Sequence, residues 1–597
     1  MSSATFASPK VHWNLSDLFS GMDDPRIEQS IGVLKKRAEI FAEKYRGRIN
    51  SPKLDAATLA EALKEYEAIG QESSKPQNFA HLLFATSSNN PEVGAFMQKM
   101  QERGTELNLI LLFFELELLA ADEKIIAPLL KDARLSNYVH YVETARTFRD
   151  HQLSEPEEKI MEELSNTGAR AFSRLFDEVT SNARFKVEKE DGSTEELSQS
   201  EVLARLRHPD RETRRRAAEG FTKGLRENNR VLTYIYNTLM QDKSTRDRLR
   251  KHRYAEESRH LSNELDKDTV ETVVSAVEKN VEMVARYYRL KRKLLNLPEL
   301  THYDRYAPLF AAEERIGWDE GREIVLGALG EFSPVAREKA SEFFTGGWID
   351  AEVRTGKRGG AFCSYTTPDL HPYVLVNYLG KLDDVMTLAH ELGHGIHASL
   401  SREQSYFNFH GTLPLAELAS TFAEMLVFEK LNQRATPKDR QALYADKIEG
   451  AFATIFRQAV MFRYEQDIHK HRREKGELRS EDFSNYWQTR QQGMFGDSVK
   501  LGEDHKLWWS YIPHFVHSPF YVYAYSFGEL LVMALFQQYR KKGKAFAEEY
   551  IALLRKGGRY SPQELMKSVG IDIKDPAFWQ GGLDVLGGMV TEFEKMA

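Results

Sequence analysis

A pair of histidines four residues apart, with a glutamate directly after the first, is the feature of this sequence best suited to metal chemistry. The residues are His390, Glu391 and His394. If the segment is helical, the histidines lie one above the other, and both imidazoles can reach one zinc ion at about 2.0–2.1 Å. Glu391 then flanks the metal, where a carboxylate can take a proton from zinc-bound water. The pattern therefore predicts a hydrolytic zinc site.

A catalytic zinc usually has a third protein ligand. His397 lies seven residues after His390, about 10.5 Å along a helix, which is too far to share its coordination shell. A metzincin-type turn is also excluded, since it needs a glycine where His397 stands. The next expected helix, which Pro414 can begin, carries Glu417 and Glu424 on one face. We expect Glu417 to be the third ligand and Glu424 to fix the tautomer of a ligand histidine.

Each part of this arrangement has a plainer alternative. The histidines could bond to neighbouring carbonyl groups inside a buried helix. The two glutamates could line a solvent-facing helix edge in salt bridges. The residues around those glutamates are mostly apolar or small, and Asp383-Asp384 suits the positive end of a helix dipole. These features favour the metal site.

The aromatic-rich stretch Trp508–Tyr525 contains groups able to stabilise the oxyanion that forms during amide hydrolysis. His514, Tyr521 and Tyr525 would share a face if the stretch were one helix, but Pro519 interrupts that pattern. Spacing does not choose among the tyrosines, which include Tyr523. Such a stretch is more often hydrophobic core than catalytic.

The elements that position these residues are expected to be mainly helical, because apolar residues recur at the helical period in most of the chain. Glycines and β-formers between Thr355 and Gly380 predict short strands before the zinc helix, which should begin near Asp383. Alternation around Asp191-Gly192 predicts a small hairpin. The clearest helical segments are Ala57–Ile69, Glu92–Glu106, Asp268–Leu295 and Ala451–Arg472.

Composition excludes other classes of protein. The formal net charge of −7 gives no sign of a nucleic-acid surface, and the basic cluster Arg211–Arg216 is expected to be a solvated helix face. The single cysteine, Cys363, cannot form an internal disulfide, which favours a reducing cytoplasm. No secretory signal pattern follows Met1. The longest apolar stretch, Leu107–Ala121, falls short of the roughly 20 residues that cross a bilayer. We read it as a buried helix and expect a cytoplasmic protein with no membrane partner.

Together, these segments resemble the zinc oligopeptidases related to thimet oligopeptidase, most closely the oligoendopeptidase F group. The resemblance is carried by His390–His394 with His397, by Glu417–Glu424 and by His514–Tyr525, and it extends weakly over most of the chain. It implies that His390, His394 and Glu417 bind one zinc ion and that Glu391 is the general base. His514 matches a histidine in the substrate-side loop.

The same resemblance implies that one or two of Tyr521 and Tyr523 stabilise the transition state. The fold that it implies is mainly α: a large, two-lobed, clam-like helical body that encloses a channel, with a small β element near the zinc helix. We expect an N-terminal helical lobe over residues 1–195 and a catalytic zinc-peptidase domain over residues 196–597. Its substrates would be short peptides.

The expected function is that of a zinc metalloendopeptidase that hydrolyses internal bonds of short oligopeptides. Two alternatives stay open: a zinc carboxypeptidase and a non-catalytic helical peptide-binding protein. Residues 359–364 also resemble a family segment, which could bind the substrate backbone by strand addition or be a structural loop.

Overall fold

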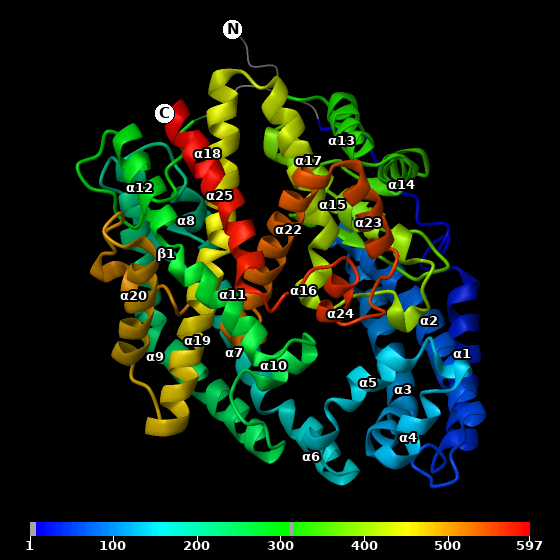
Figure 1. The fold of residues 1–597 in the computed structure, drawn as a ribbon. Helices are drawn as coiled ribbons and strands as arrows, with labels where there is room; N and C mark the ends of the chain where they lie inside the picture. The colour runs from blue at the N-terminus through cyan, green and yellow to red at the C-terminus, as the bar shows by residue number, and fades with distance from the viewer. Residues whose placement is uncertain (1–7, 311–314) are drawn as a thin grey trace. The chain divides into compact units, whose positions relative to one another are not determined.

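The computed structural model describes residues 8–310 and 315–597, and helices account for 68% of the chain (Figure 1). The prediction of a mainly α fold is confirmed. The described helices contain no segment that is both long and apolar enough to cross a membrane.

The chain forms two compact units that alternate along the sequence. The first contains Met1–Arg149, Glu314–Arg434 and Leu535–Asp572, and the second contains Asp150–Glu313, Ala435–Ala534 and Ile573–Ala597. Each unit is assembled from three separate stretches of the chain, whereas the sequence predicts two continuous domains with a boundary at residue 195. That boundary stays a prediction.

The first unit holds the helices around the candidate zinc site. Its elements are α1 (Pro25–Tyr45), α2 (Ala56–Thr86), α3 (Pro91–Ala120), α4 (Glu123–Leu129), η1 (Ala133–Leu135), α5 (Val139–Arg146), α13 (Trp318–Phe332), α14 (Pro334–Thr345), β3 (Ile349–Asp350), β4 (Phe362–Ser364), β5 (Tyr373–Leu375), α15 (Leu382–Ser401), η3 (Tyr406–Asn408), α16 (Leu413–Ala416), α17 (Leu418–Arg434), α23 (Lys544–Leu554) and α24 (Pro562–Lys567).

Three long helices, α1 to α3, open this unit. Their N-termini are capped by the side chains of Asp24, Asp55 and Asn90, each of which accepts a backbone N–H of the first turn. The segment Leu107–Ala121 forms the end of α3 and its C-cap, but it is not wholly buried, since Leu109 is 66% exposed. The expectation of a buried helix is wrong for that side, because α3 buries only one face against its neighbours.

A three-stranded sheet lies directly before α15 in the chain. Its strand order is β3-β5-β4, with β3 parallel and β4 antiparallel to the central, buried β5. β4, which contains Cys363, is therefore an edge strand of this sheet. The predicted small β element before the zinc helix is confirmed, as is the helix start near Asp383.

The second unit contains the predicted hairpin, where Phe185 pairs with Leu197. Its elements are α6 (Glu155–Ser165), α7 (Ala169–Asn182), β1 (Phe185–Glu188), β2 (Thr194–Leu197), α8 (Gln199–Arg205), α9 (Arg211–Leu249), α10 (Glu257–Ser262), α11 (Lys267–Lys279), α12 (Glu282–Leu294), α18 (Pro437–Thr454), α19 (Phe456–Lys475), α20 (Ser480–Phe495), η4 (Glu503–Leu507), α21 (His514–His517) and α25 (Pro576–Met596). Two elements, η2 (Arg149–His151) and α22 (Tyr523–Lys542), contain residues of both units.

The basic cluster at the start of α9 is not the solvated face that its composition predicts. Arg214 is 2% exposed and donates to Asp304 at 3.0 Å, and Arg211 donates to the same carboxylate at 2.8 Å. Arg215 alone of these three behaves as expected, in exposed ion pairs with neighbours on its own helix. The prediction is wrong for Arg214, because its partner lies in a distant part of the sequence.

Candidate active site

Helix α15 positions the histidine pair and the glutamate beside it. Its start is fixed by the Asp384 carboxylate, which accepts the backbone N–H groups of Leu379 at 2.7 Å and Lys381 at 3.0 Å. His390 and His394 lie one helical turn apart, with ring centroids separated by 4.9 Å. The helix therefore presents two imidazoles on one face, as the sequence predicts.

The third expected ligand, Glu417, stands at a break between α16 and α17. The sequence predicts a continuous helix from Pro414, whereas the backbone turns at Glu417 with φ −85° and ψ 5°. Helical pairing resumes when the Thr421 N–H bonds to the Glu417 carbonyl at 3.2 Å. Glu417 thus stands at the start of α17, and its carboxylate contacts the histidines of α15.

Helices α15 and α17 lie side by side (Figure 1). The contact occurs at Gly393, where an added Cβ would lie 2.5 Å from the Ala419 carbonyl oxygen and 2.6 Å from the Ser420 Cα. Only a residue without a side chain allows this approach. Gly393 is therefore the residue that lets the carboxylates of α17 reach the histidines of α15.

The three expected ligands converge on a point. Glu417 Oε2 lies 3.2 Å from His390 Nε2 and 3.4 Å from His394 Nε2. Ligand atoms bound tetrahedrally at 2.0–2.1 Å are separated by about 3.3 Å, so these two distances fit a shared zinc ion. The same three residues form a group of ligand atoms that lie within 4.8 Å of one another.

Two further side chains orient this group. The Glu424 carboxylate accepts a hydrogen bond from His390 Nδ1 at 2.5 Å, which directs Nε2 toward the shared point. Ser420, which is fully buried, donates its hydroxyl to Glu417 Oε2 at 2.7 Å. The Glu424 contact was expected from the seven-residue spacing to Glu417. Ser420 was missed, and its sequence signal is only a hydroxyl one helical turn after a predicted ligand.

The charges of the group compensate one another. Burial lowers the pKa of His390, but the hydrogen bonds that its ring donates to the Glu417 and Glu424 carboxylates outweigh this effect and raise that pKa well above its usual value. Burial raises the pKa of Glu417, but hydrogen bonds from His390 and His394 lower it overall. The two carboxylates therefore favour a positive charge at the point where the three side chains meet, and a metal ion would compete with a proton for it.

Glu391 is buried beside this group and is 5% exposed. Its Oε2 atom has no hydrogen-bond partner among the described residues. Burial raises the pKa of its carboxyl group, and the charges of His390 and His394 offset only part of that rise. A carboxyl whose protonated form is stabilised by burial can both take up and release a proton, as general acid–base catalysis requires.

His397 does not join the group that holds His390 and His394. It is buried, its Nδ1 has no hydrogen-bond partner among the described residues, and burial lowers its pKa to about 3. Its ring packs edge-on against Tyr365, with centroids 6.3 Å apart. The exclusion of His397 as a ligand, which was argued from helical rise, agrees with this geometry.

The aromatic stretch forms two helices, α21 and α22, joined by a turn at Pro519. The turn still brings three predicted side chains together. The rings of His514 and Tyr521 are stacked with centroids 6.2 Å apart, and the centroids of Tyr521 and Tyr525 are 4.8 Å apart. The Tyr525 hydroxyl lies 3.4 Å from His514 Nε2. A hydroxyl and an imidazole are thereby grouped without a continuous helix.

Tyr523 lies apart from that group. It is 1% exposed, and its hydroxyl accepts a hydrogen bond from Asn263 at 2.8 Å and lies 3.0 Å from His260 Nδ1. Burial raises the pKa of this hydroxyl above its usual value. Its contacts are those of a buried structural tyrosine.

A second group of possible metal ligands in the described part of the chain is formed by His151, His252 and Glu257. The two rings stack at 4.0 Å with planes only 19° apart. The lone pair of each imidazole nitrogen lies in the plane of its own ring. Two stacked rings therefore cannot both direct a lone pair at one ion. Glu257 is moreover paired with Arg253. We therefore assign no metal to this group.

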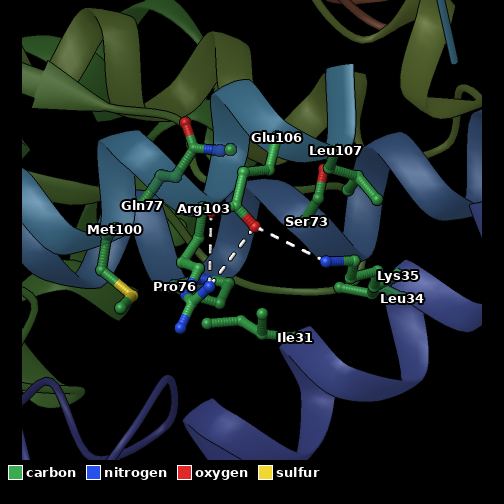
Figure 2. A pocket seen from close by; sticks show the side chains of 11 residues that line it. Ile31, Leu34, Lys35, Ser73, Pro76, Gln77, Met100, Arg103, Glu106 and Leu107 are labelled. Carbon is green, nitrogen blue, oxygen red and sulfur yellow. Dashed lines mark hydrogen bonds and ion pairs between the residues drawn. The ribbon is translucent and has the colours of Figure 1, made fainter. Parts of the chain in front are cut away.

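A pocket between α1, α2 and α3 is also unsuited to the predicted chemistry (Figure 2). Its lining contains no histidine or cysteine, and its single carboxylate, Glu106, is paired with Arg103 at 3.3 Å and lies 3.9 Å from Lys35. Apolar side chains such as Ile31 and Leu34 form much of the wall. The candidate site is therefore the histidine group of α15.

Two protein families match this chain. Residues 328–585 match the model described as Peptidase family M3, and residues 117–185 match the one described as Oligopeptidase F. The first match contains the histidine pair, Glu391 and Glu417, and it extends through the aromatic stretch.

Similar proteins span almost the whole chain. Oligopeptidase PepF of Bacillus subtilis is 28% identical over 98% of this chain and 87% of its own length, and an oligoendopeptidase F homolog of Lactococcus lactis is 23% identical over 98% and 97%. Among solved structures, a putative peptidase from Chlamydophila abortus has a TM-score of 0.85 at 22% identity, covering 98% of both chains. Oligoendopeptidase-F from Enterococcus faecium has a TM-score of 0.72 at 22% identity, covering 96% of this chain and 98% of its own.

Proposed function

Because the chain belongs to peptidase family M3, we propose that this metallopeptidase is a zinc-dependent endopeptidase that cuts internal bonds of short oligopeptides. The observation that carries the proposal is the convergence of His390, His394 and Glu417 at separations of 3.2 and 3.4 Å, with Glu391 buried beside them. The names of its relatives, oligopeptidase and oligoendopeptidase, support short peptides as the substrates.

The donor set supports zinc as the metal. Two neutral imidazoles and one carboxylate are a ligand combination of catalytic zinc sites. When bound, a zinc ion would polarise the scissile carbonyl and make a water molecule more acidic. His390, His394 and Glu417 would hold one such ion per chain.

The chain's own residues would move the protons. Glu391 takes a proton from the attacking water and delivers it to the leaving amine. Its burial favours the protonated form, which helps it take up the proton from water, and the leaving amine is basic enough to accept that proton afterwards. Glu424 keeps Nδ1 of His390 protonated and so leaves Nε2 available to a metal.

His514 and a tyrosine would stabilise the oxyanion by donating hydrogen bonds. Tyr521 is the better candidate of the two predicted tyrosines, since it stacks on His514, while the Tyr523 hydroxyl is held by Asn263 and His260. Tyr525 joins Tyr521 as a candidate, because its hydroxyl lies 3.4 Å from the His514 ring.

Strand β4 would bind the substrate backbone. It is an edge strand, so one side of its backbone is not used by the sheet's own strands. Backbone pairing by strand addition contributes affinity without reading many side chains. That mode suits an enzyme with broad peptide specificity.

A peptide with both ends blocked and a fluorophore–quencher pair tests the proposal. We expect internal cleavage by the zinc-loaded protein, and a matched peptide with a free C-terminus should give the same internal products. Release of single C-terminal residues, with the blocked peptide left intact, would instead favour the zinc carboxypeptidase.

Metal analysis distinguishes the proposed enzyme from the other alternative, a non-catalytic helical peptide-binding protein. Protein purified without chelators should contain about one zinc per chain, as three convergent ligands imply. A protein that binds peptides but holds no stoichiometric zinc and cleaves none of them would be a helical peptide-binding protein.

A further inference from the structure

The turn that joins α21 to α22 has an unusual residue at its third position. The N–H of Tyr521 bonds to the carbonyl of Ser518 at 3.0 Å, with Pro519 and Phe520 between them. Phe520 has φ +58°. Proline second and a positive φ third define a type II turn, in which glycine or asparagine normally takes the third position. A bulky aromatic residue there is strained.

Burial of the Phe520 ring holds the strained residue in place. The side chain is fully buried. It packs against Phe462 with ring centroids 6.1 Å apart and against His469 at 4.7 Å. Lys243 lies 5.8 Å from the ring centroid. Burial of the ring explains why glycine, which would relieve the strain, does not occupy this position.

The backbone of the same residue is held by a carboxyl group from α19. Glu465, which is 1% exposed, accepts the Phe520 N–H through Oε1 at 2.7 Å. This N–H is buried and would otherwise lack a partner. Burial raises the pKa of Glu465 to about 8, so near neutral pH the group is chiefly an uncharged acceptor.

The turn determines where the aromatic group lies. His514 precedes it and Tyr521 closes it, and their rings stack at an interplanar angle of 4°. Tyr525 follows within the first turn of α22. If the turn relaxed, Tyr521 would move relative to His514, because the chain between the two residues runs through this turn.

We propose that Glu465 is a positioning residue, which holds the strained turn at Phe520 and thereby keeps Tyr521 stacked on His514 for catalysis. The proposal rests on the proposed peptidase function of His514 and the tyrosine. It assigns a catalytic consequence to a carboxyl group that contacts none of the reacting atoms.

A set of three variants tests the proposal. Glu465→Leu removes the acceptor, while Glu465→Gln keeps an uncharged one of similar shape. Asn237→Leu is the matched control: Asn237 is 2% exposed in the same unit and accepts a loop N–H, that of Leu478, at 2.9 Å. Each variant is measured for zinc content, unfolding temperature, kcat and KM with the blocked peptide.

We expect kcat of Glu465→Leu to fall between tenfold and about 100-fold, as a displacement of about 1 Å in catalytic groups produces. Zinc content should stay at the wild-type level and KM should change little. Glu465→Gln should restore most of the lost kcat. Asn237→Leu should lower the unfolding temperature and leave kcat near wild type.

Three results would overturn the proposal: wild-type kcat in zinc-loaded Glu465→Leu, an equal loss in Glu465→Gln, or an equal loss in Asn237→Leu. If Glu465→Leu does not fold, Pro519→Gly loosens the same turn at a partly buried position and should lower kcat several-fold. A wild-type kcat in Pro519→Gly would also contradict the proposal. A zinc-loaded wild-type protein that cleaves no peptide would refute the peptidase function itself, and this inference with it.

Discussion

Replacing Gly393 with alanine would perturb the spacing of the two helices that hold the candidate metal ligands. The added Cβ would lie 2.5 Å from the Ala419 carbonyl oxygen and 2.6 Å from the Ser420 Cα. Carbon atoms in ordinary contact are separated by about 3.5–4.0 Å, so α17 must move away from α15 by roughly 1 Å. Both obstructing atoms belong to backbone, which cannot rotate aside.

The displacement acts on metal binding more than on stability. Glu417 and Glu424 would both move with α17 away from His390. Misplaced ligand and tautomer partners lower metal affinity by roughly 10- to 100-fold. Overpacking costs about 1–3 kcal/mol, but alanine gains about 1 kcal/mol over glycine in a helix, so the net loss of unfolding free energy is only about 0–2 kcal/mol.

The assay is zinc affinity by competition with a chromophoric chelator, together with thermal unfolding. Gly395→Ala is the matched control, because its Cβ would meet the Phe343 ring, a side chain on α14, and not the backbone of α17. Gly327→Ala on α13 meets open space and should stabilise the protein slightly. Wild-type zinc affinity in Gly393→Ala would refute the reasoning, as would an equal loss in Gly395→Ala.

Three further outcomes follow from the site. Glu424→Gln should lower zinc affinity about 10- to 100-fold, since the acceptor of His390 Nδ1 is weakened; unchanged affinity would contradict the assigned contact. The raised pKa of His390 means that zinc must displace a proton, so zinc affinity should fall as pH falls, by about tenfold per pH unit for each proton released, and a flat profile below neutral pH would be contrary. Tyr523→Phe should destabilise the fold by about 1–3 kcal/mol, because the partners of its buried hydroxyl, Asn263 and His260, lose a contact. Its kcat should stay near wild type, and a 100-fold loss would make Tyr523 catalytic.

The parts of the site that depend on local spacing could be predicted from the sequence. The helical repeat alone brings His390 and His394 to one face, and the start of α15 follows from its acidic first turn. Glu417 and Glu424 were expected on one helix, and both carboxylates do contact His390, despite the break that ends α16.

Features that depend on distant partners could not be predicted. Arg214 is buried because Asp304 accepts its guanidinium, although the two are ninety residues apart. The turn at Phe520 is held by Glu465, which lies fifty-five residues earlier. Neither pairing has a local pattern that distinguishes it from an ordinary exposed charge. The segment 268–295 likewise reads as one helix but forms two, α11 and α12, which meet at Asn280.

In the proposed mechanism, Glu391 moves the proton at a zinc site formed by His390, His394 and Glu417. The most direct test is the rate of blocked-peptide cleavage by Glu391→Gln, measured with its zinc content. We predict about one zinc per chain and a kcat at least about 100-fold lower than wild type, since a general base contributes roughly 10²–10⁴-fold. Wild-type turnover in the zinc-loaded Glu391→Gln protein would contradict this mechanism.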